Sequence, residues 1–74
     1  MSRKNKLDKA ILKRQLRRDA IQGTLRTLAM FRKDGLHPPK GTVKHLEALD
    51  SILENEIALL KHEINILYLG GKRG

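Results

Sequence analysis

The chain has 74 residues, no cysteine and a formal net charge of +8, and only 3% of its residues are aromatic. This length allows one domain with a thin core, and the lack of cysteine excludes disulfides and cysteine-based zinc sites. The composition is typical of a helical interaction protein rather than of an enzyme with a deep pocket.

Positive charge is concentrated in the first half of the chain. Residues 1–41 hold twelve Lys and Arg against three Asp, a balance of +9, whereas residues 42–74 hold four Lys and Arg against five Asp and Glu, a balance of −1. No apolar stretch follows the basic start as in a signal peptide, and none is long enough to cross a bilayer. We therefore expect a cytoplasmic protein with an acidic partner.

The first expected helix covers about residues 6–34, a stretch without proline. Asn5 is its predicted N-cap, with Asp8 completing a capping-box-like start. Gly35 stands where a left-handed C-cap belongs. The apolar residues of this segment share one face of a helical wheel: Leu7, Ala10, Ile11, Ile21, Leu25, Leu28 and Ala29.

Six cations of this helix are the candidate binding residues for nucleic acid or an acidic protein surface. Four of them form one ridge by their i, i+3, i+4 spacing: Lys6, Lys9, Lys13 and Arg17. The other two, Arg14 and Arg18, fall on the apolar face, where unpaired burial is unfavourable. Either they reach Glu56 or Glu63 across a hairpin, or this part of the helix projects as a basic arm along phosphates. A solvated face and an anionic membrane surface are the alternatives.

A turn over residues 35–41 separates the two helices. Pro38 and Pro39 cannot continue a helix, because proline lacks the N–H group and clashes with the preceding turn. Thr42 is the predicted N-cap of a second helix that runs to about residue 69. Gly70 and Gly71 are expected to end it, and residues 70–74 to form a tail.

The second helix carries two apolar rows. The first is a heptad pattern with mostly β-branched a positions and leucine d positions: Val43, Asp50, Ile57 and Ile64, and Leu46, Leu53, Leu60 and Leu67. The second row lies on another side: Leu49, Ile52, Leu59 and Ile66. One row is expected to meet the first helix and the other a second molecule.

The fold class predicted from these patterns is all-α, a two-helix antiparallel hairpin that dimerises into a four-helix bundle or coiled coil. Asp50 interrupts the apolar a row, and the structural interpretation is a polar residue that sets the register. The apolar contact must provide most of the stability, because an exposed ion pair contributes only about 0.5 kcal/mol.

A local resemblance offers an enzymatic interpretation. Gly35-Leu36, Val43 and the segment Leu46-Glu47-Ala48-Leu49-Asp50-Ser51-Ile52-Leu53 resemble the short aspartyl-phosphate phosphatases of the sporulation phosphorelay, which are small antiparallel helical hairpins. Their signature is Ser-x-x-x-Asp, and Leu46 stands here in place of the serine. The resemblance implies that Asp50 is the catalytic acid and that it helps orient water for hydrolysis of an aspartyl phosphate on a partner response regulator.

The main functional prediction is a small non-enzymatic regulator that binds nucleic acid or an acidic protein surface through its first helix. A small phage-type inhibitor of a larger enzyme is a further alternative, so a larger protein partner remains open. No cofactor is expected. No metal site is expected either, because His37, His45 and His62 do not follow the spacing of metal ligands.

Overall fold

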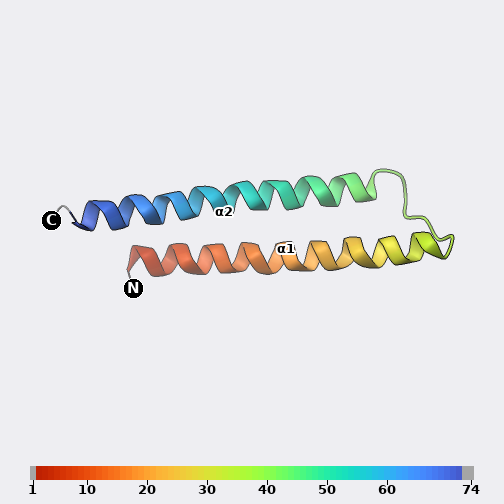
Figure 1. Ribbon diagram of the computed structural model, residues 1–74, viewed down its shortest axis with the longest axis horizontal. Coiled ribbons are helices and arrows are strands. Elements are labelled where there is room, and N and C mark those ends of the chain that lie inside the picture. The colour runs from red at the N-terminus through yellow and green to blue at the C-terminus, as the bar shows by residue number, and fades with distance from the viewer. Residues whose placement is uncertain (1, 73–74) are drawn as a thin grey trace.

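The protein is a hairpin of two long helices that lie antiparallel over most of their length (Figure 1). The structure is a computed structural model that describes the backbone of residues 2–72 and the side chains of residues 2–69. Helix α1 is Arg3–Lys33 and helix α2 is Thr42–Lys72. The molecule measures 61 × 18 × 14 Å, so it is a thin rod. The predicted all-α antiparallel hairpin is confirmed.

Helix α1 begins three residues earlier than predicted. Its N-cap is Ser2, which has an extended backbone and accepts a hydrogen bond of 3.2 Å at its side-chain oxygen from the Asn5 N–H. The prediction of Asn5 as N-cap was therefore wrong. Serine is as good a cap as asparagine, and the earlier start adds about one helical turn.

Helix α1 ends at the glycine that the sequence indicated. Gly35 has a φ of 84°, the left-handed conformation that glycine adopts without strain. The Leu36 N–H donates to the Phe31 carbonyl at 2.9 Å and the Gly35 N–H donates to the Arg32 carbonyl at 3.1 Å. These two bonds are those of a Schellman motif, which satisfies the last carbonyls of the helix.

Helix α2 differs from the prediction at both ends. Thr42 is its first residue, and Gly41 precedes it with a φ of 90°. The helix continues through Gly70 and Gly71 to Lys72, so the expected stop was wrong, and residues 73–74 lie outside the described part of the chain. Each glycine costs a helix only about 1 kcal/mol, and without a following proline a long helix propagates through them.

The heptad row of α2 faces α1 and forms the apolar contact that we call the seam. Leu53 and Ile57 are buried there, together with Leu7 and Ile11 of α1. The remaining heptad residues are partly buried: Val43, Leu46, Asp50, Leu60, Ile64 and Leu67. The heptad row is thus used within the chain, between two antiparallel helices.

The second row of α2, which we call the apolar stripe, stays exposed in the single chain. The exposed fractions are 38% for Leu49, 54% for Ile52, 66% for Leu59 and 55% for Ile66. Within the described residues, neither helix is apolar enough over its length to span a membrane.

Candidate functional site

Arg14 and Arg18 turn toward α2 and pair with acids across the seam. Arg14 Nε donates to a Glu56 carboxylate oxygen at 3.0 Å, and Arg14 Nη1 donates to the Ala10 carbonyl at 3.1 Å. Of the two interpretations drawn from the sequence, the pairing across the hairpin therefore holds for Arg14.

Arg18 pairs with a residue that the sequence analysis had not matched to it. Its Nε and Nη2 atoms donate to the two oxygens of Asp50 at 2.9 and 3.2 Å, and Glu54 approaches the guanidinium to 3.7 Å. The side chains of Arg18 and Asp50 are only 25% and 19% exposed. A bidentate guanidinium–carboxylate pair fixes two chains in one orientation, so this pair sets how the helices align.

The environment of Asp50 favours its charged form. The hydrogen bonds from Arg18 hold the pKa of the Asp50 carboxyl below its ordinary value, although desolvation raises that pKa. The positive charge of Arg18 and a hydrogen bond from Gln22 also lower the pKa of Asp50. The pKa of Arg18 is raised, chiefly by the same hydrogen bond to Asp50. Both groups are therefore ionised at neutral pH.

Asp50 is thus engaged on both carboxylate oxygens by one arginine. The structural interpretation of this residue, a polar position within the seam, accounts for its place, its pKa and its partner. The catalytic role implied by the phosphatase resemblance stays a prediction, and no contact of Asp50 adds support to it.

The other predicted binding residues form an exposed basic ridge on α1, defined by Lys6, Lys9, Lys13 and Arg17. Among residues 2–69, no Asp or Glu pairs with Lys6, Lys13 or Arg17. At spacings of three to four residues, the ridge extends over about 16 Å of helix. Lys6, Lys13 and Arg17 of the basic ridge therefore present positive charge to solvent, whereas Arg14 and Arg18 are paired with acids of α2.

Two further cations near the start of α1 form only long ion pairs. Arg3 lies 3.9 Å from Glu63, and Lys4 lies 3.9 Å from Asp8. All four side chains are about half or more exposed, so these pairs contribute little. Glu63, a predicted partner of Arg14 or Arg18, thus lies near Arg3 instead.

An apolar groove lies beside the basic ridge on the same side of the hairpin. It encloses about 490 Å³ between the helices. Its lining residues are Arg17, Ala20 and Ile21 of α1 and Leu49, Ile52, Leu53 and Glu56 of α2. Arg17 therefore belongs to both the basic ridge and the edge of this groove, and the apolar stripe of α2 continues away from it.

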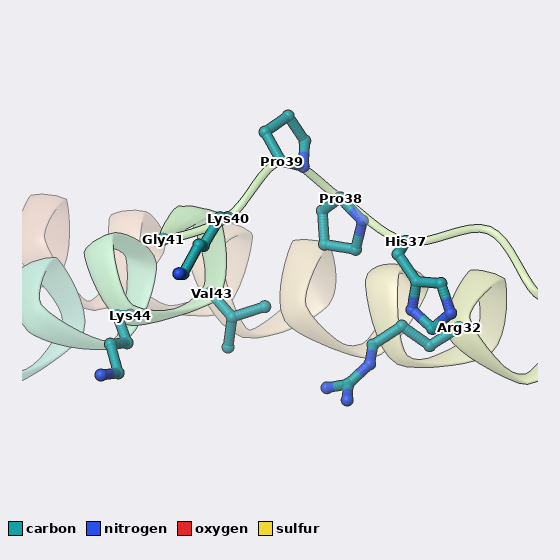
Figure 2. Close-up of a pocket in the computed structure, with 8 residues that line it drawn as sticks. All are labelled: Arg32, His37, Pro38, Pro39, Lys40, Gly41, Val43 and Lys44. Atoms are coloured by element: carbon teal, nitrogen blue, oxygen red, sulfur yellow. The ribbon is translucent and has the colours of Figure 1, made fainter.

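A second hollow, at the turn, brings Arg32, Lys40 and Lys44 together with His37, a grouping that the sequence did not predict. Arg32, His37, Lys40 and Lys44 line a volume of about 420 Å³ together with Pro38, Pro39, Gly41 and Val43 (Figure 2). We call this the turn hollow. The signal in the sequence was the cluster of cations on both sides of the proline pair, without an acid between Gly35 and Leu46.

The described residues contain no group of three or more His, Asp or Glu side chains arranged to hold a metal ion. Comparison of the chain with protein families, with curated proteins and with solved structures finds no match. The function is therefore inferred from the geometry and charge of the hairpin itself.

Proposed function

We propose that the protein is a small non-enzymatic regulator that binds nucleic acid through the basic ridge of α1. The observation that carries this proposal is the division of the cations: Arg14 and Arg18 pair with acids of α2, while Lys6, Lys13 and Arg17 have no acidic partner within residues 2–69. A row of unpaired cations on one rigid helix matches the regularly spaced charges of a phosphate backbone.

The expected mode of binding is contact with phosphates rather than with bases. No aromatic side chain lies within α1 before Phe31, so the ridge has no platform on which a base can stack. Lysine acts as a flexible point charge, which fits phosphate contact without base recognition. Binding should therefore depend strongly on salt and weakly on sequence.

The salt dependence of binding tests this proposal. Three to four phosphate contacts per hairpin predict a slope of about −3 for log K against log salt concentration, or an affinity loss of roughly fifty-fold between 50 and 200 mM salt. Fluorescence anisotropy with a labelled short duplex and a labelled single strand measures this slope. Salt-insensitive affinity, or no binding to either probe at about 50 mM salt, would reject the proposal.

We infer further that two hairpins associate through the apolar stripe of α2. Among residues 2–69, only four apolar side chains are buried in the single chain, and chains of this size commonly gain stability by association. Residues 42–74 have a net charge of only −1, so two α2 helices can approach each other with little electrostatic repulsion. The strongly basic α1 helices would then remain outside.

An acidic surface on a larger protein is the second candidate partner, because the groove places apolar side chains directly beside Arg17. An acidic amphipathic helix would satisfy both features. Nuclease treatment of a lysate before pull-down separates the two candidates, since only a protein complex survives it. The described contacts favour nucleic acid, because most of the ridge lies beyond the groove lining.

A further inference from the structure

We propose that the turn hollow is a second anion site, one that binds a terminal phosphate or a small phosphorylated compound. It lies at the end of the hairpin where the two helices connect, and it does not depend on the basic ridge. From Arg17 to Arg32 the helix rises about 22 Å, which is beyond the Debye length of about 8 Å at physiological salt. The two sites therefore bind their ligands separately.

The polar side chains of the turn hollow come from three parts of the chain. Arg32 comes from the last turn of α1, His37 and Lys40 come from the connection, and Lys44 comes from the first turn of α2. Figure 2 shows Arg32 and His37 on one side of Val43 and Lys40 and Lys44 on the other. Three separate parts of the chain thus bring positive or hydrogen-bonding groups to one hollow.

The lining of the turn hollow carries no compensating negative charge. No acidic residue lines the hollow, and among residues 2–69 no carboxylate pairs with Arg32, Lys40 or Lys44. This contrasts with Arg14 and Arg18, which the fold pairs with acids. Like charges gathered without a partner repel one another, and an anion relieves that repulsion.

The backbone that frames the turn hollow is held in place by hydrogen bonds and prolines. The Schellman motif fixes Gly35 and Leu36 at the end of α1, and two prolines restrict the backbone of the connection. The Thr42 N–H donates to the Pro39 carbonyl at 3.1 Å, which holds the connection against the start of α2. A fixed backbone limits the entropy lost when the side chains close on a ligand.

The chemistry of the lining points to phosphate rather than to a carboxylate peptide. Arg32 offers a planar fork that matches two phosphate oxygens, and Lys40 and Lys44 add point charges that suit a doubly charged anion. Pro38 and Val43 supply an apolar wall beside them. The ligand class is therefore a compact phosphate group, free or at the end of a polynucleotide.

Inorganic pyrophosphate is the first probe, read by amide shifts in two-dimensional NMR of the intact chain. We expect saturable shifts at His37, Gly41 and Lys44. The triple variant Arg32→Gln, Lys40→Gln, Lys44→Gln should weaken this binding at least about tenfold, because charge-assisted hydrogen bonds are lost. All three side chains are exposed, so the variant should fold, and circular dichroism checks this.

The matched control is the triple variant Arg26→Gln, Lys33→Gln, Lys61→Gln. It removes one arginine and two lysines from exposed positions outside the hollow, so it carries the same net charge. It should retain pyrophosphate affinity within about twofold, since none of its three side chains lines the hollow and an exposed charge without direct contact is screened by salt. Equal weakening of the two triple variants, or shifts in the wild type that do not saturate, would overturn the proposal.

A pair of oligonucleotides of one sequence, with and without a 5′-phosphate, identifies the source of the ligand. Larger amide shifts at the turn with the phosphorylated strand indicate that the ligand is the end of a polynucleotide. Equal amide shifts with both strands, together with saturable pyrophosphate binding, indicate that the ligand is a small phosphorylated compound. Both results support the site. Ridge variants should leave the pyrophosphate affinity unchanged, so failure of the turn site and failure of the ridge proposal are distinguishable.

Discussion

Arg18 and Asp50 face each other across the seam and are joined by two hydrogen bonds of 2.9 and 3.2 Å. The pair stands within a contact that is otherwise largely apolar, between the buried side chains and the turn. A polar layer of this kind specifies which residues of the two helices lie opposite, because a shift of register would break both hydrogen bonds between Arg18 and the mostly shielded Asp50.

Breaking this pair on one side should be more harmful than replacing it entirely. Arg18→Met leaves Asp50 mostly shielded and unpaired, so the melting temperature should fall. Adding Asp50→Leu to that variant completes the apolar a row and should restore the melting temperature at least to that of the wild type. Thermal unfolding followed by circular dichroism measures both.

Arg26→Met is the control for these variants, because it removes an exposed arginine from the same helix. Its melting temperature should stay close to that of the wild type. A double variant that melts no higher than Arg18→Met would contradict the role assigned to the pair.

The pair also predicts an acid-sensitive contribution to stability. The pKa of Asp50 is lower in the folded chain than its ordinary value of about 4. The stabilisation that Asp50 gives to the folded chain is therefore fully present at a pH above that ordinary value. It is lost progressively as the pH falls through the folded-state pKa. Between pH 6 and about 2.5, the wild type should therefore lose more stability than Asp50→Asn, which has no titrating group there. Parallel loss in both proteins would contradict this.

The buried part of the seam should carry most of the stability of the single hairpin. Leu53→Ala removes a side chain that is 9% exposed and should cost about 2–4 kcal/mol. Leu12→Ala is the control, because Leu12 is 55% exposed on α1 and should change stability by under about 0.5 kcal/mol. Chemical unfolding with urea measures the free energy of unfolding of both variants. Similar losses of stability in Leu53→Ala and Leu12→Ala would contradict a core formed by the buried part of the seam.

The fold was largely predictable because its signals are local. The proline pair and the glycine at position 35 act through the backbone, and the turn and the helix end that they predicted are confirmed. The heptad spacing in 43–67 predicted a helix, which is confirmed, whereas association of two molecules through α2 stays a prediction. The ends of the helices were less predictable. Ser2 and Asn5 are comparable caps, and only the side-chain geometry decides between them.

The pairing of Arg18 with Asp50 was not predictable in detail from spacing alone. The arginines on the apolar face indicated that acids would lie opposite, and Glu56 was correctly among them for Arg14. The choice between Asp50 and its neighbours depends on the length of the connection, since a shift of one helical turn changes every partner. The turn hollow was missed for the same reason, as its residues meet only once the connection is folded.

Association through the apolar stripe predicts a concentration-dependent molar mass. The wild type should sediment as a dimer at micromolar concentration, and Leu59→Asn with Ile66→Asn should shift it toward the monomer, because these two side chains are 66% and 55% exposed in the single chain. Their removal takes away apolar area that association would bury.

The control is Leu12→Asn with Leu16→Asn, which removes two comparably exposed apolar side chains from α1. Sedimentation equilibrium of this control should match the wild type. A monomeric wild type, or equal dissociation of the two double variants, would exclude the stripe as the interface.

The most direct test of the central claim compares two double variants of equal charge in a nucleic-acid binding assay. Lys13→Gln with Arg17→Gln removes two ridge cations, whereas Arg26→Gln with Lys33→Gln removes one lysine and one arginine that are exposed elsewhere on α1. The ridge variant should lower affinity for a short duplex at least about tenfold and reduce the salt slope by about 2. The control should keep both values near those of the wild type, and equal losses in the two variants would contradict binding through the basic ridge.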